Sequence, residues 1–363
     1  MNILILTKEN NGGGLITHVV NLANTIKKKG NKVVVVGPLV NGNKGRFEDL
    51  NCDYIPLPLS TKNLIEFQKN IQILKTIVRN KKIDIIHSHN RVTSVYAKFI
   101  SKQIGIPFVW TLHLNNIPSS PISRMLTFYG KKAIVVSSDI VPFCVEKLGI
   151  KREDIVVGYN GVYEEKYISF AQDEKKKVRK KYGITEDQKV IVLLCRLDPI
   201  KGHEIMIKAL EGLESNKDYI VLFAGDSMVA GYKEKLKKLV SEKNLDYHIR
   251  FVGYVDPVEI LNISDLFVLP SANEGFPISM IEAFLLRVPV IRTRTGGYVD
   301  VKDCIIAMDN AEDLREDIKR FLNDELEIKD IVERGYEFAI KNCTCDAMTE
   351  KVLSIYNEVI QVK

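Results

Sequence analysis

The sequence predicts an α/β protein of two domains, each a doubly wound parallel sheet covered by helices. Three observations lead to this prediction. The chain has 363 residues, which is too long for one ordinary α/β domain. Short apolar runs rich in Val and Ile alternate with longer segments of helical spacing. The alternation then starts again in the second half, so right-handed crossovers would wind each half into its own sheet.

The first half carries seven candidate strands, at Asn2–Thr7, Lys32–Gly37, Cys52–Pro56, Ile83–His87, Phe108–Thr111, Ala133–Val136 and Ile155–Val157. Between most of them lie segments with apolar residues at helical spacing, at Leu15–Lys29, Asn63–Asn80 and Arg91–Ile104. Continuous apolar strands separated by helices are typical of a parallel sheet that is covered on both faces.

The second half repeats this alternation. Its candidate strands are Val190–Cys195, Tyr219–Ala224, Ile249–Val252, Leu266–Leu269 and Val290–Arg292. Its candidate helices are His203–Leu213, Lys233–Lys243 and Ile278–Leu286. We place the boundary near Val162, which gives domains of residues 1–162 and 163–345, followed by one amphipathic helix at Asp346–Val362. The charged run Asp173–Gly183 fits a solvated helix face, with anion binding as the alternative.

Composition and charge place the chain among soluble globular proteins. Hydrophobic residues make up 45% and charged residues 27%, which is ordinary for folded domains. The net charge of +6 suits a diphosphate or an anionic membrane face and is too small for a nucleic-acid-binding surface. The six cysteines lack metal-site spacing, which indicates reduced thiols in a cytoplasmic protein. The sequence predicts neither a signal peptide nor a membrane-spanning segment.

A glycine-rich turn follows the first strand. Gly13 and Gly14 lead directly into the helix expected from Leu15. Glycines at a helix start let a ligand approach the backbone closely, and the free amides there attract an anion. A tight turn without a ligand explains these glycines equally well. The turn is not G-x-G-x-x-G, which argues against a dinucleotide cofactor.

The second half places charged residues in two loops at strand ends, where open α/β sheets bind ligands. Arg196 and Lys201 share one strand-to-helix loop, and two cations just before a helix suit a diphosphate. Glu274 follows the strand Leu266–Leu269, and Glu282 lies one to two turns into the next helix. Carboxylates at such places can bind ribose or sugar hydroxyls. Each of these charges, taken alone, is more commonly solvent-facing.

Histidines at strand ends are further candidates. His113 follows the strand Phe108–Thr111, and His87 and His89 form an H-S-H pair at the end of another strand. A metal would need a third ligand besides two histidines that lie two residues apart on a strand. The sequence offers no evident third ligand, so no metal site is predicted. A single strand-end histidine is commonly a structural residue.

Together these features resemble the retaining nucleotide-sugar glycosyltransferases of family 4, which have the GT-B fold. The specific part is R-x4-K at Arg196 and Lys201 with E-G-F-P-x4-E at Glu274 and Glu282. Weaker matches at strand ends are DIIHSH, TLH, VSS, YNGV, FAGD, FVGYV and TGG. The resemblance covers most of the chain. It implies an α/β fold of two Rossmann-like doubly wound domains facing a central cleft, with a C-terminal helix of about residues 346–363 packed back on the first domain.

The resemblance also implies roles for individual residues. Arg196 and Lys201 would bind the donor diphosphate and stabilise the leaving group, and Glu282 would bind the ribose. Glu274 would contact the transferred sugar, and His113 matches the family's histidine near the anomeric carbon. These two residues, with Arg196 and Lys201, are the candidate catalytic residues. The remaining candidate donor-binding residues are Gly13, Gly14, Gly253, Tyr254, Gly275, Phe276, Pro277 and Ile278.

The implied activity is transfer of a sugar from a nucleotide-diphosphate sugar, with UDP favoured, to an acceptor hydroxyl with retention of anomeric configuration. Cell-surface glycan or glycolipid synthesis is the expected process, and no metal or other cofactor is required. Acceptor choice is expected to lie in the loops Leu39–Arg46 and Leu114–Pro121. The alternatives are a GT-B-type nucleotide-sugar epimerase or phosphorylase, an NAD-dependent oxidoreductase, and a non-catalytic nucleotide-sugar-binding module.

The expected partners are the nucleotide-sugar donor and a glycan or lipid-linked glycan acceptor, without nucleic acid. Peripheral contact with the anionic inner face of a membrane is a further hypothesis. It rests on three basic runs, at Lys27–Lys29, Arg79–Lys82 and Lys131–Lys132. Solubilising lysines at helix ends explain these runs equally well.

Overall fold

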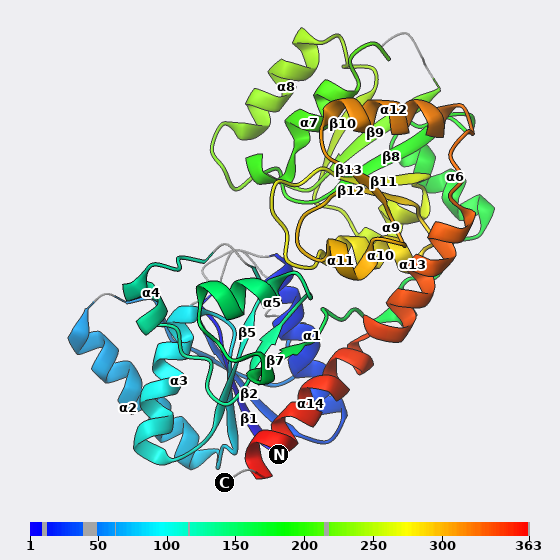
Figure 1. The fold of residues 1–363 in the computed structure, drawn as a ribbon. Coiled ribbons are helices and arrows are strands. Elements are labelled where there is room, and N and C mark those ends of the chain that lie inside the picture. Colours follow the sequence, from blue (N-terminus) through cyan, green and yellow to red (C-terminus); the bar gives the residue numbers. More distant parts are fainter. Residues whose placement is uncertain (9–12, 39–48, 62, 115–116, 214–217, 362–363) are drawn as a thin grey trace. The chain divides into compact units, whose positions relative to one another are not determined.

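The chain forms two compact units (Figure 1). The computed structural model describes residues 1–8, 13–38, 49–61, 63–114, 117–213 and 218–361. Unit 1 comprises Met1–Val162 together with Asn342–Lys363, and unit 2 comprises Tyr163–Lys341. Of the two expected acceptor loops, residues 39–46 and 115–116 lie outside the described part of the chain.

Unit 1 contains a seven-stranded parallel sheet. Its strands are β1 (Asn2–Leu6), β2 (Lys32–Gly37), β3 (Asp53–Pro56), β4 (Ile85–Ser88), β5 (Phe108–Leu112), β6 (Ala133–Val135) and β7 (Ile155–Val157). Their order is β3-β2-β1-β4-β5-β6-β7. The chain builds outward from β1 in one direction and then returns to place β4 on its other side. The winding therefore reverses between β1 and β4, which is where doubly wound sheets bind ligands.

Helices cover both faces of this sheet. They are α1 (Gly14–Lys28), α2 (Leu64–Asn80), α3 (Arg91–Ile104), α4 (Pro121–Met125), α5 (Ile140–Pro142) and α14 (Cys345–Gln361). Successive side chains of a strand point to opposite faces. Ile3 and Ile5 accordingly pack with α1 and α14, whereas Leu4 and Leu6 pack with α2 and α3. The C-terminal helix α14 therefore contributes directly to the core of unit 1.

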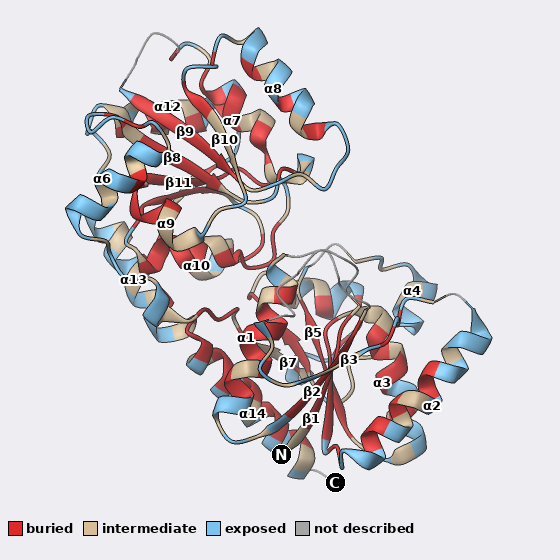
Figure 2. Ribbon diagram, turned by 180° about the vertical axis from the view of Figure 1, so that it is seen from behind, coloured by how far each residue is buried: buried red, intermediate tan, exposed pale blue. Residues whose placement is uncertain are grey.

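Unit 2 contains a six-stranded parallel sheet. Its strands are β8 (Lys189–Leu194), β9 (Tyr219–Ala224), β10 (Ile249–Gly253), β11 (Leu266–Leu269), β12 (Val290–Thr293) and β13 (Ile306–Met308). They lie in the order β10-β9-β8-β11-β12-β13, with a reversal between β8 and β11. Figure 2 shows that the strands of both sheets are largely buried, as expected for parallel sheets that helices cover.

The helices of unit 2 are α6 (Gln172–Lys181), α7 (His203–Ala209), α8 (Tyr232–Glu242), α9 (Pro257–Asn262), α10 (Ile278–Leu285), α11 (Tyr298–Val301), α12 (Ala311–Leu322) and α13 (Lys329–Asn342). Helix α6 is the charged run read from the sequence as a solvated helix. It buries only Val178, which confirms that reading. In the described part of the chain, none of the helices combines the length and the apolar character that crossing a membrane requires.

The fold class predicted from the sequence is confirmed. Every predicted strand begins and ends within two residues of its expected bounds. The same holds for every predicted helix, except for the C-terminal end of one. That helix, α7, ends at Ala209 instead of Leu213, and the chain turns through Gly212 at a φ of 87°. The sequence reasoning missed β13 and the helices α4, α5, α9, α11, α12 and α13. With three residues, β13 is too short to show a period.

Candidate active site

In unit 2, the loop after β8 presents both predicted cations. Arg196 is exposed, and Lys201 is the last residue of a short 3₁₀ turn that Asp198 caps, its Oδ1 accepting from the Ile200 amide at 3.1 Å. The next residue, Gly202, has a φ of 74° and begins the turn into α7. A Cβ there would lie 2.0 Å from the carbonyl oxygen of Pro270. Only glycine allows this close approach of the β8 loop to the β11 loop.

The close approach brings Lys201 to Glu274. The lysine Nζ lies 2.6 Å from Glu274 Oε1, and the two side chains are 18% and 8% exposed. The Ala272 amide also donates to the Ile200 carbonyl at 2.8 Å, which ties the two loops together. The sequence predicted both residues in one site, and the structure joins them by a short ionic hydrogen bond. A shielded pair of this kind is stronger than one in open solvent.

A buried arginine supports the Glu274 loop from the other side. Arg292 of β12 is fully buried, and its Nη2 donates to the carbonyl of Gly296 at 2.8 Å and to Thr295 Oγ1 at 3.0 Å. A Cβ on Gly296 would lie 2.2 Å from the Glu274 carbonyl oxygen. Arg292 therefore holds the T-G-G turn against the backbone of Glu274. The sequence reasoning missed this residue, although a cation inside an apolar strand is an unusual signal.

Glu282 lies on α10 and is 6% exposed. Its Oε1 accepts a hydrogen bond of 2.7 Å from the hydroxyl of Tyr167. Tyr167, which follows a short 3₁₀ turn at the start of unit 2, was not among the predicted site residues. The predicted positions Gly275, Phe276, Pro277 and Ile278 are all buried and connect Glu274 to α10.

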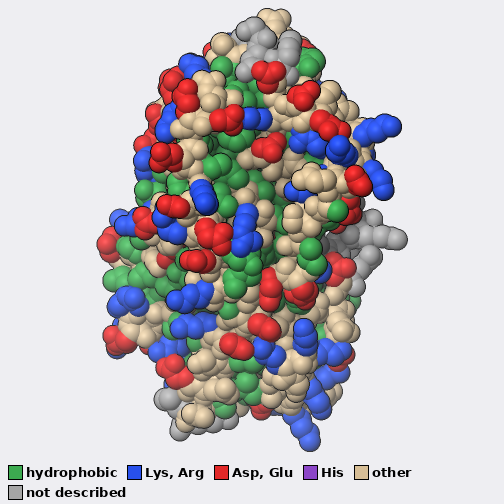
Figure 3. Space-filling view, turned by 90° about the vertical axis from the view of Figure 1, so that its right-hand side faces the viewer, with side chains coloured by type: hydrophobic (Ala, Val, Ile, Leu, Met, Phe, Trp, Pro, Cys, Tyr) green, Lys and Arg blue, Asp and Glu red, His purple; other side chains and the backbone are tan. Residues whose placement is uncertain are grey.

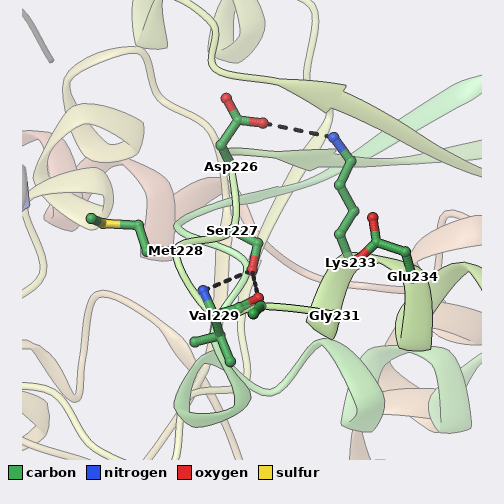
Figure 4. Close-up of a pocket in the computed structure, with 8 residues that line it drawn as sticks. Asp226, Ser227, Met228, Val229, Gly231, Lys233 and Glu234 are labelled. Carbon is green, nitrogen blue, oxygen red and sulfur yellow. Dashed lines mark hydrogen bonds and ion pairs between the residues drawn. The ribbon is translucent and has the colours of Figure 1, made fainter. Parts of the chain in front are cut away.

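The predicted nucleobase residues lie farther along the sheet. Gly253 ends the edge strand β10 and Tyr254 is 72% exposed. Two strands, β9 and β8, lie between β10 and β11 in the sheet. Figure 4 shows a pocket at the end of β9, where Asp226 Oδ1 faces Lys233 Nζ at 3.7 Å. The pocket adjoins the cationic loop, because the amide of Leu197 donates to the Asp226 carbonyl at 3.1 Å.

In unit 1, the carboxyl ends of β4 and β5 bring histidines together with α1. His89 follows β4, His113 follows β5, and His18 lies on α1, which begins at Gly14 after the half-buried Gly13. His89 Nδ1 lies 3.2 Å from His113 Nε2, and the His18 ring centroid is 4.9 Å from that of His113 and 5.3 Å from that of His89. The sequence reasoning found no third partner for the H-S-H pair; the structure supplies His18 and His113.

Burial keeps these rings neutral. It lowers the pKa of His18 from 6.5 to about 4, against the opposing effect of its hydrogen bond to Asn160. Burial and the neighbouring histidines hold the pKa values of His89 and His113 well below the usual range. At neutral pH the three imidazoles can therefore donate or accept hydrogen bonds, but they do not supply positive charge.

His87, the other member of the H-S-H pair, is engaged within the core. Its Nδ1 lies 2.6 Å from the hydroxyl of Tyr356 on α14, and its Nε2 lies 2.6 Å from Thr111 Oγ1. The ring is fully buried. His87 therefore ties the C-terminal helix to the sheet, which is a structural role.

Two protein families match the chain. Residues 12–166 match Glycosyltransferase Family 4, and residues 174–338 match Glycosyl transferases group 1. Among curated proteins, a putative teichuronic acid biosynthesis glycosyltransferase of Bacillus subtilis is 28% identical over 73% of this chain and 68% of its own length. A UDP-Gal:alpha-D-GlcNAc-diphosphoundecaprenol alpha-1,3-galactosyltransferase of Escherichia coli is 24% identical over 87% of this chain and 82% of its own.

Solved structures share the fold. A glycosyltransferase from Rickettsia africae superposes with a TM-score of 0.86 at 24% identity, covering 100% of this chain and 99% of its own. HepE of Anabaena, solved in complex with UDP-glucose, superposes with a TM-score of 0.84 at 18% identity, covering 99% and 100%. At these identities the likeness shows the fold alone.

Proposed function

We propose a sugar-transfer reaction for this chain from one premise: it belongs to the family 4 glycosyltransferases, with the GT-B fold. Membership of this family makes the chain a glycosyltransferase. The proposal adds that the donor is a UDP-sugar, that the acceptor is a hydroxyl of a glycan or lipid-linked glycan, and that the anomeric configuration is retained.

The Lys201–Glu274 pair is the observation that carries the proposal. Its 2.6 Å contact lies at the carboxyl ends of β8 and β11, on either side of the point where the winding of the sheet reverses. Doubly wound sheets bind nucleotides at such a point. Lys201 and Arg196 would then contact the donor diphosphate, Glu274 the transferred sugar, and Glu282 the ribose, where it would exchange its bond with Tyr167 for the ribose hydroxyls.

The proposed step breaks the bond between the anomeric carbon and the diphosphate oxygen and forms one from that carbon to the acceptor oxygen. The acceptor proton passes to an oxygen of the departing diphosphate on the same face of the sugar. Negative charge grows on the diphosphate, where Lys201 and Arg196 stabilise it. His113, neutral because of its burial, would position sugar hydroxyls near the anomeric carbon. The reaction as proposed requires no metal and no other cofactor.

A thermal-shift panel tests the donor assignment. The full chain is heated with UDP, GDP, ADP, their common sugar conjugates and NAD(H). A ligand at 100 times its Kd should add about 2.7 kcal/mol of stability, which raises the Tm by several degrees. We expect a shift with the uridine ligands that Glu282→Ala abolishes. A shift with NAD(H) alone, or with none of the ligands, would refute the assignment.

Product analysis tests the reaction itself. With an α-linked UDP-sugar and an accepted acceptor, NMR of the anomeric proton should show an α-linked product, and turnover should persist in a chelator. A β-linked product would refute retention. Release of free sugar or of an epimerised donor without any acceptor would instead indicate one of the alternative activities.

Membrane contact is proposed for unit 1. Unit 1 carries 24 Lys and Arg against 13 Asp and Glu, a net charge of +11, whereas unit 2 has 28 against 33 and a net charge of −5; the two give the +6 of the whole chain. Large apolar side chains are also exposed, at Leu64 (78%) and Ile65 (81%) of α2 and at Ile122 (75%) and Met125 (77%) of α4. Exposed apolar side chains on a positively charged unit favour binding to an anionic lipid surface.

The structure changes which residues support this contact. In the predicted basic runs, Lys29 pairs with Asp346 and Glu350, and Lys132 pairs with Glu358. On the face drawn in Figure 3, blue and red side chains are interspersed. The apolar residues are therefore the better anchor. Co-sedimentation with anionic vesicles at low salt should fall in Ile122→Ser/Met125→Ser, and equal sedimentation of variant and parent would refute the assignment.

A further inference from the structure

The histidine cluster of unit 1, defined as His18, His89 and His113, holds more nitrogen atoms than the surrounding groups use. Each ring can present one nitrogen such that the three nitrogens lie within 4.8 Å of one another. They come from α1 and from the segments after β4 and β5. His18 and His89 are 1% and 2% exposed. The cluster is therefore a compact, shielded set of three nitrogen donors.

Hydrogen bonding fixes which nitrogens remain available. His18 Nδ1 lies 2.9 Å from Asn160 Oδ1. If that oxygen is an acceptor, Nδ1 carries the hydrogen of the neutral ring and Nε2 carries a lone pair. His18 Nε2 is buried and has no hydrogen-bond partner among the described residues. Buried polar atoms without partners are uncommon in proteins and call for an explanation such as a bound ion.

We propose that His18, His89 and His113 bind one divalent transition-metal ion of the zinc class. Three imidazoles suit Zn²⁺, Co²⁺, Ni²⁺ and Cu²⁺, whereas Mg²⁺ and Ca²⁺ take oxygen ligands. Three histidines with a fourth position open to water or another oxygen are a known zinc arrangement. The set contains no thiolate and no carboxylate, so it favours the borderline ions over hard ones.

The spacing of the cluster fits this ion. Zinc–nitrogen bonds of about 2.0–2.1 Å in a tetrahedral site place two ligand atoms about 3.4 Å apart. His89 Nδ1 and His113 Nε2 are 3.2 Å apart, and an ion bound there replaces the hydrogen that they share. The nitrogen that His18 offers lies within 4.8 Å of those of His89 and His113. Asn160 then acts as the group that orients a metal ligand through its second nitrogen.

This inference is independent of the proposed transfer reaction, which requires no metal. An ion on the cluster would hold the His113 ring away from the sugar, so metal binding would inhibit transfer. The binding itself stands on unit 1 alone. Its failure would leave the donor assignment in unit 2 untouched, and failure of the donor assignment would leave the metal site untouched.

Cobalt titration of the full chain tests the site. The protein is stripped with a chelator, dialysed and titrated with Co²⁺ under visible and near-ultraviolet absorption, followed by displacement with Zn²⁺. We expect one ion per chain, with the intense visible bands of tetrahedral cobalt and without a thiolate charge-transfer band. Saturation at one equivalent with a thiolate band would assign the ion to cysteines and overturn the proposal, as would the absence of binding.

Variants locate the ion. His89→Gln and His113→Gln should each abolish the tetrahedral spectrum; the half-buried His113 is the substitution that the fold tolerates more easily. Asn160→Leu keeps all three ligands and should weaken binding about 10–100-fold. His248→Gln removes a buried histidine of unit 2 and should bind as the parent does. Circular dichroism confirms folding for each. An unchanged spectrum in folded His113→Gln would refute the site.

Discussion

His203 makes unit 2 less stable in mild acid, and the burial of its ring determines how much unfolding free energy is lost. The residue is fully buried at the start of α7, directly after the cationic loop. Burial lowers its pKa from 6.5 to about 4, against an opposing interaction with Asp198, and the nearby charge of Lys201 also lowers it. Between these two values the unfolded chain binds a proton that the folded protein does not. The contribution of His203 to stability is therefore fully present above pH 6.5 and is lost as the pH falls toward 4.

The magnitude follows from the two pKa values. A difference from 6.5 to about 4 corresponds to about 3 kcal/mol in total, at 1.36 kcal/mol for each pH unit. About 2 kcal/mol of this is lost by pH 5. Glutamine in place of His203 does not titrate, so His203→Gln should lose about 2 kcal/mol less than the parent between pH 7.5 and pH 5, whatever its stability at pH 7.5.

Urea denaturation measures this difference. Unfolding of the parent and of His203→Gln is followed at pH 7.5, 6 and 5, with a probe of unit 2, and each free energy is extrapolated to water. A matched control is Lys237→Gln, an exposed substitution on α8 of the same unit, which should keep the slope of the parent. Parallel pH dependence in His203→Gln and the parent would refute the reasoning, because it would mean that the folded protein protonates His203 as readily as the unfolded chain does.

Three further predictions concern the site and its support. Lys201→Met should lower kcat by roughly 10²–10³, and near-normal turnover in a steady-state assay would refute its role. Gly202→Ala, which forces a Cβ to 2.0 Å from a backbone carbonyl, should lower the free energy of unfolding by about 3 kcal/mol or more; Gly212→Ala, at a similar φ with open space around it, should lower it by about 1 kcal/mol. Tyr356→Phe leaves buried His87 without its partner on α14 and should cost about 1–3 kcal/mol, measured by the same denaturation.

Much of the fold follows from the sequence because the strands are continuous apolar runs bounded by turn residues. The elements that were missed lack this difference between an apolar run and the turn residues around it. Helix α12 nevertheless has a readable signal, since Asn310 caps it and Leu314, Ile318 and Phe321 form its buried face. The short strand β13 has no comparable signal. The three residues IAM form a strand because β12 offers a sheet edge to pair with and α12 covers the new strand. Both contacts come from other parts of the chain, so the three residues alone do not predict a strand.

The contents of the candidate site were predictable, but its contacts were not. Glu274 and Lys201 are 73 positions apart, and their contact depends on two loops meeting at Gly202. The histidine cluster shows the same limit. His89 and His113 end neighbouring strands, so strand order alone could have paired them. The position of His18 was harder to predict. Helical spacing places His18 on the buried face of α1, but it does not show which loops pack against that face.

The Lys201–Glu274 pair is better explained by ligand binding than by stability. Moving two charges out of water costs several kcal/mol for each ion, and well-packed apolar residues in their place are often as stabilising or more so. Here the pair is shielded at strand ends, in loops held by Gly202 and Gly296. A donor diphosphate offers Lys201 a second anionic partner, while its sugar offers hydroxyls to Glu274. Donor binding therefore replaces the Lys201–Glu274 contact with contacts to the diphosphate and to the sugar, and it places Lys201 beside the leaving group.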